Sequence, residues 1–154
     1  MKQAALLQDV AAAARAGDLA RALELTVEAL GADTGTLHFL AEDGQLHLGA
    51  TGGGIPPFVM DKIRVIPVGK GMAGLAVERA APVTACNIQT DASGDVRPGA
   101  KATGLEGAIC VPVLADGRAV GALGVANRVE RTFTDAEQEL LLAVGRELAA
   151  GRRA

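Results

Sequence analysis

The chain has 154 residues, of which 49% are hydrophobic and 21% are charged, and its formal net charge at pH 7 is -3. A chain of this length and apolar content can bury a core, so we expect a single domain over residues 1–154. The basic residues are scattered and only Arg152-Arg153 are adjacent, so the charge pattern predicts no nucleic-acid partner.

The first thirty residues have the periodicity of two helices. Leu6, Val10 and Ala13 share one face of a helix expected over residues 2–16, and Gly17-Asp18 provide a break and an N-cap for the next helix. Polar residues interrupt the apolar run at the N-terminus before it is long enough for a signal peptide or a membrane span. We therefore expect a cytoplasmic protein with no membrane association.

A hairpin follows, with its turn at Asp43-Gly44. This dipeptide suits a two-residue type I′ turn, because both central residues of that turn have positive φ. The resulting register places Phe39 opposite Leu48 and puts His38 and His47 on one mixed face. We expect both histidines to be at the surface or half-buried, because two histidines without a third ligand do not make a usual metal site.

The segment between the two hairpins should contain a strand at 63–68, a short helix at 72–79 and a strand at 82–86. A long polar connection then runs over residues 87–104, and connections of this length are usually functional or mobile.

Three glycines at the start of that short helix, Gly69, Gly71 and Gly74, have the spacing of a dinucleotide-binding loop. The preceding strand contains Pro67, however, and Ala81-Pro82 ends the helix after two turns, so the βαβ context of such a loop is missing. The glycines instead indicate a tight turn into the helix and its close approach to the sheet.

A second hairpin is expected around Asp116-Gly117. Its register would place Ile109 and Ala122 on one face, and Cys110 and Val125 on the other. Because both faces are apolar, these strands should be central in the sheet.

The last helix should begin at a capping box formed by Thr134 and Glu137. Its apolar side chains spread more widely around the helix than one sheet face needs, which predicts a homodimer through the terminal helices. These apolar residues are Leu140, Leu141, Leu142, Val144 and Leu148.

Taken together, five segments resemble the GAF domain family over about residues 18–150. They are VGKGMAG at 68–74, AAPV at 80–83, ICVPV at 109–113, DGRAVGAL at 116–123 and FTDAE at 133–137. The resemblance implies an α+β fold with a central antiparallel sheet of about six strands. It also implies terminal helices on one face of the sheet and, on the other, a small-molecule pocket roofed by the short helix and loops.

On this resemblance the pocket is expected to be mostly apolar, with few polar groups to orient a ligand. The expected roof is Phe58, Met60, Met72, Ala73 and Leu75, the walls are Thr84, Cys86, Asn87 and Asp91, and the floor is Ala108 and Cys110. Only Phe58 among these could stack on a base or a pigment ring, which favours a small, weakly aromatic metabolite over a haem, a bilin or a purine cyclic nucleotide. No cofactor and no metal are expected.

The family includes an enzyme, free methionine-R-sulfoxide reductase, whose cysteines and pocket carboxylate this chain does not match. Met72-Ala73 stand where the enzyme has one cysteine, residues 87–104 contain none, and Ala108 stands where the enzyme has its glutamate. Catalysis by Cys86 or Cys110 would need a different geometry, so an enzyme remains an alternative and no catalytic residue is expected.

Other family members bind cyclic nucleotides and share a motif that Asn127-Arg128, Phe133 and Glu137 partly resemble. The second acid of the motif is Gln138 here, and an apolar anchor followed by a helix cap also accounts for these residues. The function indicated is a sensory module with an unidentified small-molecule ligand and an output through self-association or a signalling protein. A dimerisation module without a ligand is the third alternative.

Overall fold

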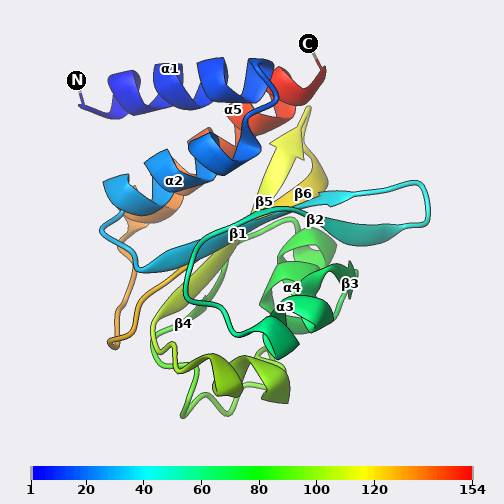
Figure 1. Ribbon diagram of the computed structural model, residues 1–154, viewed down its shortest axis with the longest axis vertical. Helices are drawn as coiled ribbons and strands as arrows, with labels where there is room; N and C mark the ends of the chain where they lie inside the picture. The colour runs from blue at the N-terminus through cyan, green and yellow to red at the C-terminus, as the bar shows by residue number, and fades with distance from the viewer. Residues whose placement is uncertain (1, 154) are drawn as a thin grey trace.

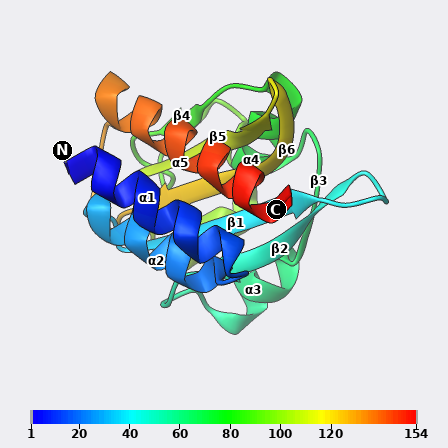
Figure 2. The same cartoon turned by 90° about the horizontal axis from the view of Figure 1, so that it is seen from above.

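The computed structural model describes residues 2–153 as one six-stranded antiparallel sheet with helices on both faces (Figure 1). Helices α1, α2 and α5 cover one face, while α3 and α4 lie on the other (Figures 1 and 2). The strand order is β3-β2-β1-β6-β5-β4, so β1 and β6 are central. In chain order the elements are α1 (Lys2–Arg15), α2 (Leu19–Ala29), β1 (Thr34–Leu40), β2 (Gln45–Thr51), α3 (Pro57–Ile63), β3 (Val65–Pro67), α4 (Gly71–Arg79), β4 (Val83–Ala85), the 3-10 helix η1 (Pro98–Thr103), β5 (Ala108–Ala115), β6 (Arg118–Ala126) and α5 (Asp135–Arg153).

The first hairpin differs from the predicted one at its turn and in its register. Ala41 N–H donates to Gln45 O at 2.9 Å, and of the two turn residues only Gly44 has positive φ, so the loop has three residues rather than a type I′ pair. Phe39 consequently lies opposite His47, not Leu48. His38 and His47 therefore face opposite sides of the sheet, and the prediction that they share a face is wrong.

The second hairpin has the predicted turn, because Asp116 and Gly117 both have positive φ, at 53° and 78°. A bulge follows at Val120, where the partner of Val113 is Gly121. Beyond this extra residue, each side chain of β6 points to the opposite face of the sheet from the one predicted. The predicted grouping of Ala122 with Ile109, and of Val125 with Cys110, is therefore wrong. Val125 lies opposite Ile109 on the face of the sheet that α1, α2 and α5 cover, while Ala122 lies on the face that α4 covers.

The segment between the hairpins contains α3, a helix that was not predicted from the sequence. Pro57 at the first turn starts this helix, and its last residue, Ile63, falls where a strand was predicted to begin. The strand β3 is therefore confined to Val65–Pro67 at the sheet edge, where Pro67 costs no ladder hydrogen bond. The short helix α4 and strand β4 lie where they were predicted.

The core lies between the sheet and the α1, α2 and α5 helices. Leu141, Val144 and Leu148 of α5 are fully buried, and Leu140 and Leu142 pack at the edges of the same cluster. Gly145 allows α5 to approach the sheet closely, since a Cβ there would lie 3.3 Å from Val113 Cα. The helix α5 packs against β5 on one side and against α1 on the other. Its wide apolar surface is therefore covered within a single chain. The homodimer stays a prediction.

Candidate functional site

A cavity of about 760 Å³ lies on the sheet face opposite the three large helices. We call it the roofed cavity, because α3, α4 and η1 close it over strands β1, β5 and β6. Its lining is mostly apolar, with Val59, Ile63, Met72 and Leu105 among the larger side chains. Both its volume and its lining are typical of sites for small organic ligands.

Three glycines shape the start of α4 beside this cavity. Gly69 and Gly71 have positive φ, at 89° and 66°, and a Cβ at Gly74 would lie 2.4 Å from Pro67 O. Only glycine fits such a turn and such a close approach without strain. This geometry confirms the backbone role predicted for the three glycines.

The cavity floor includes Cys110 of β5, a half-buried free cysteine. Burial raises the pKa of its thiol to about 12, so at neutral pH it is present as the protonated thiol. A protonated thiol is a poor nucleophile, and Cys110 is therefore an apolar wall residue in this state.

His38 of β1 also lines the cavity and is 1% exposed, which contradicts the surface or half-buried position predicted for it. Its Nε2 lies 2.7 Å from Ile63 O. A carbonyl oxygen can only accept, so Nε2 carries the proton. Burial lowers the pKa of the imidazole and favours the neutral ring, which leaves Nδ1 as an acceptor.

Two buried polar atoms of cavity residues have no hydrogen-bond partner within the described part of the chain. They are His38 Nδ1 and Thr34 Oγ1. Buried polar groups in folded proteins are nearly always paired. Both atoms are enclosed by the protein, so neither is open to a molecule in the cavity.

All the charged residues that line the cavity are basic. Lys62 comes from α3, Lys70 immediately precedes α4, and Arg97 immediately precedes η1; we call these three the lining cations. No Asp or Glu belongs to the lining given by residues 2–153, and no ion pair to a lining cation is present there. The start of α4 between them also has no side-chain cap.

The structure brings four of the predicted site residues together in the cavity lining: Met72, Ala73, Ala108 and Cys110. Met60 and Leu75 are half-buried outside it, and Phe58 is 55% exposed on α3. Phe58 therefore offers no stacking surface to a molecule inside the cavity.

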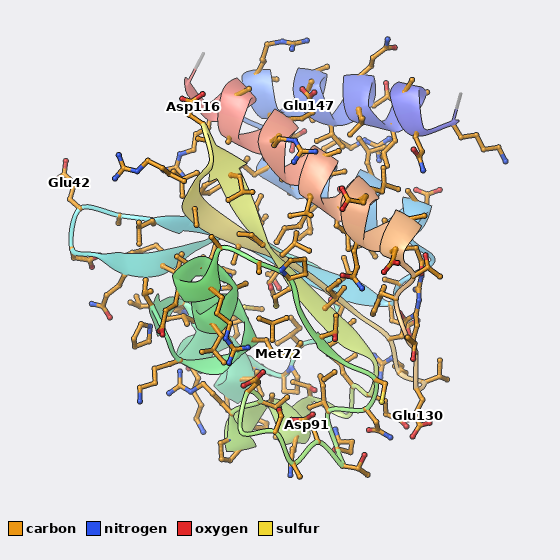
Figure 3. The ribbon with its side chains drawn as sticks, turned by 180° about the vertical axis from the view of Figure 1, so that it is seen from behind. Glu42, Met72, Asp91, Asp116, Glu130 and Glu147 are labelled. Carbon is orange, nitrogen blue, oxygen red and sulfur yellow. The ribbon has the colours of Figure 1, made fainter. Side chains whose placement is uncertain are left out.

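None of the four predicted wall residues belongs to the lining. Thr84 and Cys86 are exposed. Asn87 is buried, but its amide donates to Glu106 and Glu130 at 3.3 and 2.8 Å. The Asp91 carboxylate accepts from Ser93, and in Figure 3 it lies on the outer connection, away from the sheet.

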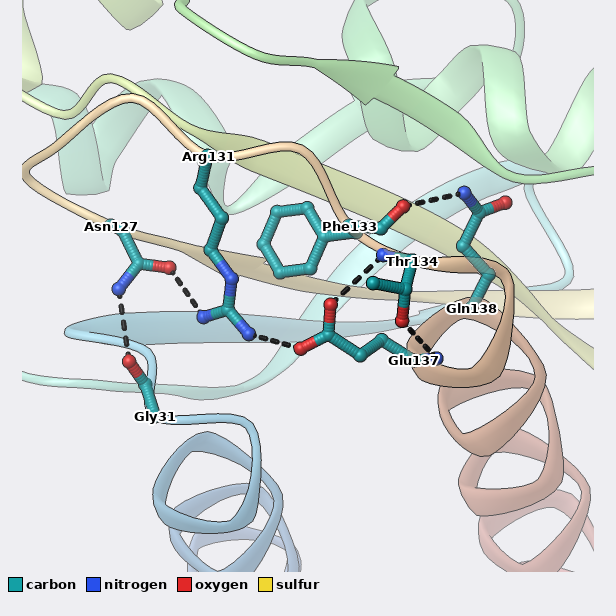
Figure 4. Close-up of polar contacts among 7 residues, drawn as sticks. All are labelled: Gly31, Asn127, Arg131, Phe133, Thr134, Glu137 and Gln138. Carbon is teal, nitrogen blue, oxygen red and sulfur yellow. Dashed lines mark hydrogen bonds and ion pairs between the residues drawn. The ribbon is translucent and has the colours of Figure 1, made fainter.

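Three of the residues that resemble a cyclic-nucleotide motif, Asn127, Phe133 and Glu137, form a structural network around Arg131 (Figure 4). Arg131 donates to Asn127 Oδ1 and to Glu137, and its guanidinium lies 4.4 Å from the ring centroid of the buried Phe133. Glu137 also completes the predicted capping box with Thr134, since the backbone N–H of each residue donates to the side chain of the other. These contacts join the β6–α5 connection to the start of α5, and none of the five residues lines the roofed cavity.

Within residues 2–153, no group of three or more His, Cys, Asp or Glu side chains is arranged to hold a metal ion. No helix in that part of the chain has the length and apolar content needed to cross a membrane.

Comparison with known proteins gives one family and many solved structures of the same fold. A family model described as GAF domain matches residues 19–151. The chain is similar to the GAF domain of an Acinetobacter phosphoenolpyruvate-protein phosphotransferase, with a TM-score of 0.79 and 19% identity over 99% of this chain and 93% of that one. The corresponding domain from Coxiella burnetii gives 0.76 and 22%, over 97% and 91%.

An enzyme of the same fold is also similar: free methionine-R-sulfoxide reductase from Neisseria meningitidis, solved with its substrate. Its TM-score is 0.77, with 19% identity over 99% of this chain and 91% of that one. At these identities the likeness establishes the fold alone. No curated protein sequence matches the chain.

Proposed function

This chain belongs to the GAF domain family, and from that premise we propose that it is a cytoplasmic regulatory module that binds a small organic molecule in the roofed cavity. Binding would change how the module associates with itself or with a signalling protein. The proposed role is sensory, without catalysis by the chain itself.

The observation that carries this proposal is the open volume of the roofed cavity together with its mostly apolar lining. A second apolar core would be filled to normal packing density and would leave few voids larger than a water molecule. The roofed cavity instead keeps about 760 Å³ open between the sheet and the helices α3, α4 and η1. A bound small molecule would fill this volume, which supports a ligand over an empty dimerisation module.

A thermal-shift screen of metabolites tests the proposal, because a ligand at a hundred times its Kd adds about 2.7 kcal/mol to the free energy of unfolding. Two variants of η1 make a matched pair. Ala100 lines the cavity and Ala102 is exposed outside the lining. Ala100→Trp should abolish the shift given by any hit, whereas Ala102→Trp should retain it. No hit across neutral, anionic and cationic metabolites, or equal shifts in both variants, would contradict the proposal.

The competing function is a divergent sulfoxide reductase, which the similar Neisseria enzyme keeps open. Two features of the thiols weigh against it. Burial holds the pKa of Cys110 at about 12, and Cys86 is exposed outside the cavity lining. Turnover of free methionine-R-sulfoxide with a thioredoxin system, abolished by Cys86→Ser or by Cys110→Ser, would reverse the ranking of the two functions.

Self-association is the proposed output, and α1 is the surface for it. This helix forms the outermost layer over the sheet (Figure 2), and its exposed residues include Ala4, Ala5 and Ala12. Small side chains of this kind allow two helices to pack closely. Sedimentation should show a dimer at micromolar concentration, and a monomer there would leave a separate signalling protein as the output.

A further inference from the structure

We propose that residues 90–104 form a lid that opens to admit a molecule to the roofed cavity, and that the ion pair between Arg79 and Asp95 is the latch that holds this lid shut. The lid belongs to the polar connection between β4 and β5 and includes η1, and in Figure 1 it is the layer farthest from α1. This inference adds control of access to the proposed function, while the opening itself does not depend on what binds.

The lid forms one wall of the cavity. Its Val96 and Ala100 pack beside Met72 of α4, and Arg97 and Gly99 also belong to the lining. Movement of the lid away from α4 therefore widens the mouth of the cavity and exposes its interior.

The lid differs from the other two parts of the roof, because it contains no buried residue. Helix α3 buries Val59 and is tied to β1 by the hydrogen bond of 2.7 Å between His38 and Ile63 O. Helix α4 buries Ala73, Gly74, Ala76 and Val77. From residue 90 to residue 104, in contrast, every side chain is exposed or half-buried. A segment with so few buried contacts opens at a lower free energy than the packed elements around it.

The two ends of the lid are fixed side by side, which provides a hinge. Ile88 N–H donates to Glu106 O at 2.6 Å, and the Gln89 side chain donates to Leu105 O at 2.7 Å. Ile88 and Leu105 are also buried in one cluster beneath the lid. Because these contacts hold the base of the loop together, the segment between them can move as a unit without disturbing β4 or β5.

One hydrogen-bonded contact joins the lid to the rest of the roof. The Arg79 guanidinium at the end of α4 donates to both carboxylate oxygens of Asp95, at 3.0 and 3.1 Å. Within residues 2–153, the other hydrogen bonds of the lid stay inside the connection 87–105. The planar fork of arginine makes this contact directional, so it sets the closed position of the lid.

The exposure of this ion pair makes it suitable as a latch. The side chains of Arg79 and Asp95 are 48% and 25% exposed. Ion pairs that are open to water favour the paired state only about two- to fivefold, because water and salt compete for both partners. The latch therefore favours the closed lid and still breaks readily.

The remaining contacts of the lid each join a glycine to a long charged side chain. The stem of Arg97 covers Gly71 at the start of α4, where a Cβ would lie 2.9 Å from Arg97 Cδ. Gly99 faces Lys62 of α3, where a Cβ would lie 3.8 Å from Lys62 Cδ. Since a glycine has no side chain to interlock, these contacts can separate and form again without repacking the core.

The Cys110 thiol on the cavity floor can report the opening of the lid in a Cys86→Ser background. The probe is N-phenylmaleimide, a neutral thiol reagent that must enter the cavity to reach this sulfur. Asp95→Asn removes the negative charge of the latch, so the rate of Cys110 modification should rise about two- to fivefold. An unchanged rate overturns the latch.

Asp61→Asn is the matched control, because Asp61 makes an exposed ion pair with Arg64 at 3.2 Å outside the lid. This variant should leave the rate of Cys110 modification unchanged, and an equal rise would overturn the inference. Arg79→Gln combined with Asp95→Asn should react no faster than either single variant, since all three break the same pair. Rises that multiply in the double variant would contradict a latch made by these two residues.

Salt provides a readout that a merely structural role of Asp95 would not give. Between about 0.01 M and 1 M salt the screening length falls about tenfold, so the exposed latch weakens. The rate of Cys110 modification should rise over this range in Cys86→Ser and stay nearly constant when Asp95→Asn is added. The same salt dependence in both proteins would contradict the latch.

Low concentrations of urea distinguish a moving lid from unfolding of the whole chain. Opening the lid exposes little surface, so below the unfolding transition the rate of Cys110 modification should depend only weakly on urea. A dependence as steep as that of global unfolding would mean that Cys110 reacts only in the unfolded chain, and the lid would be refuted.

These measurements use no metabolite, so they separate the lid from the proposed function. If the latch variants behave as expected while the thermal-shift screen finds no ligand, the lid stands and only the proposed function fails. If the screen finds a ligand while the latch variants leave the rate of Cys110 modification unchanged, the cavity is a ligand site and the lid alone is wrong.

Discussion

Thr34→Val should stabilise the protein, although it removes a polar group from a strand of the sheet. Thr34 is 5% exposed and its Oγ1 has no hydrogen-bond partner within the described residues. A buried polar group without a partner costs about 1–3 kcal/mol, and a methyl group of the same shape carries no such cost. We expect the free energy of unfolding to rise by about 1 kcal/mol, which is about 2–4 °C in Tm for a chain of this size.

Thr26→Val is the matched control, because Thr26 is also fully buried but its hydroxyl donates to Ala22 O at 2.9 Å. The substitution removes that hydrogen bond, so the free energy of unfolding should fall by about 1 kcal/mol. Urea unfolding of both variants without ligand measures the difference of about 2 kcal/mol between them. A loss of stability in Thr34→Val equal to that in Thr26→Val would refute the reasoning, since it would mean that Thr34 Oγ1 is hydrogen-bonded.

Three further predictions concern ionisable groups. The folded-state pKa of His38 is lowered from its ordinary 6.5 by burial, so its contribution to stability is full above pH 6.5 and is lost as the pH falls below that value. Unfolding measured between pH 5 and 7.5 should show this decline in His47→Gln and a smaller one in His38→Gln. The pKa of Glu137 is lowered from 4.5 by the Thr134 N–H and by Arg131, so the contribution of Glu137 to the free energy of unfolding is full above pH 4.5 and is lost as the pH falls below it. In Glu137→Gln the free energy of unfolding should therefore change less with pH below 4.5. The pKa of the Cys110 thiol is about 12, so at pH 8 roughly one part in ten thousand is thiolate. In the Cys86→Ser variant, Cys110 should therefore react with a thiol reagent far more slowly than Cys86 reacts in the Cys110→Ser variant. Equal rates would mean that the Cys110 thiol is not enclosed.

The two hairpins show how far local sequence determined the fold. Both contain Asp-Gly between alternating residues, but only Asp116-Gly117 adopts the type I′ turn. At Asp43-Gly44 the loop takes one more residue, and glycine alone provides the positive φ. Because Asp-Gly is compatible with both loop lengths, the dipeptide alone does not determine which loop forms. The loop length depends on how the paired strands twist and pack.

The site was predicted where it depends on strand alternation and missed where it depends on α3 and on the connecting segments. Ala108 and Cys110 alternate with the core residue Ile109 along β5, so their position on the cavity face could be predicted. His38 alternates with Leu37 and Phe39 along β1, but its burial could not be predicted, because it depends on α3, whose Ile63 O accepts from His38 Nε2.

The lining cations carry no common sequence signal. Lys62, Lys70 and Arg97 come from segments that approach one another only in the folded chain, and charged residues in loops normally face solvent. Nothing in the sequence groups them, or separates them from Lys101, which is exposed as they are but lies outside the lining.

Strand β5 has the cavity on one face and α5 packed against the other. Ala108 and Cys110 contribute side chains to the cavity, while Ile109 and Val113 belong to the core beneath α5. At Gly145 the backbone of α5 lies almost directly on that of β5, with no side chain between them to absorb a displacement. Close-packed interiors transmit strain rather than dissipate it. Under the proposed function, a ligand that displaced the cavity floor would therefore move β5 against α5, and α5 against the outer helix α1, without contacting either helix itself.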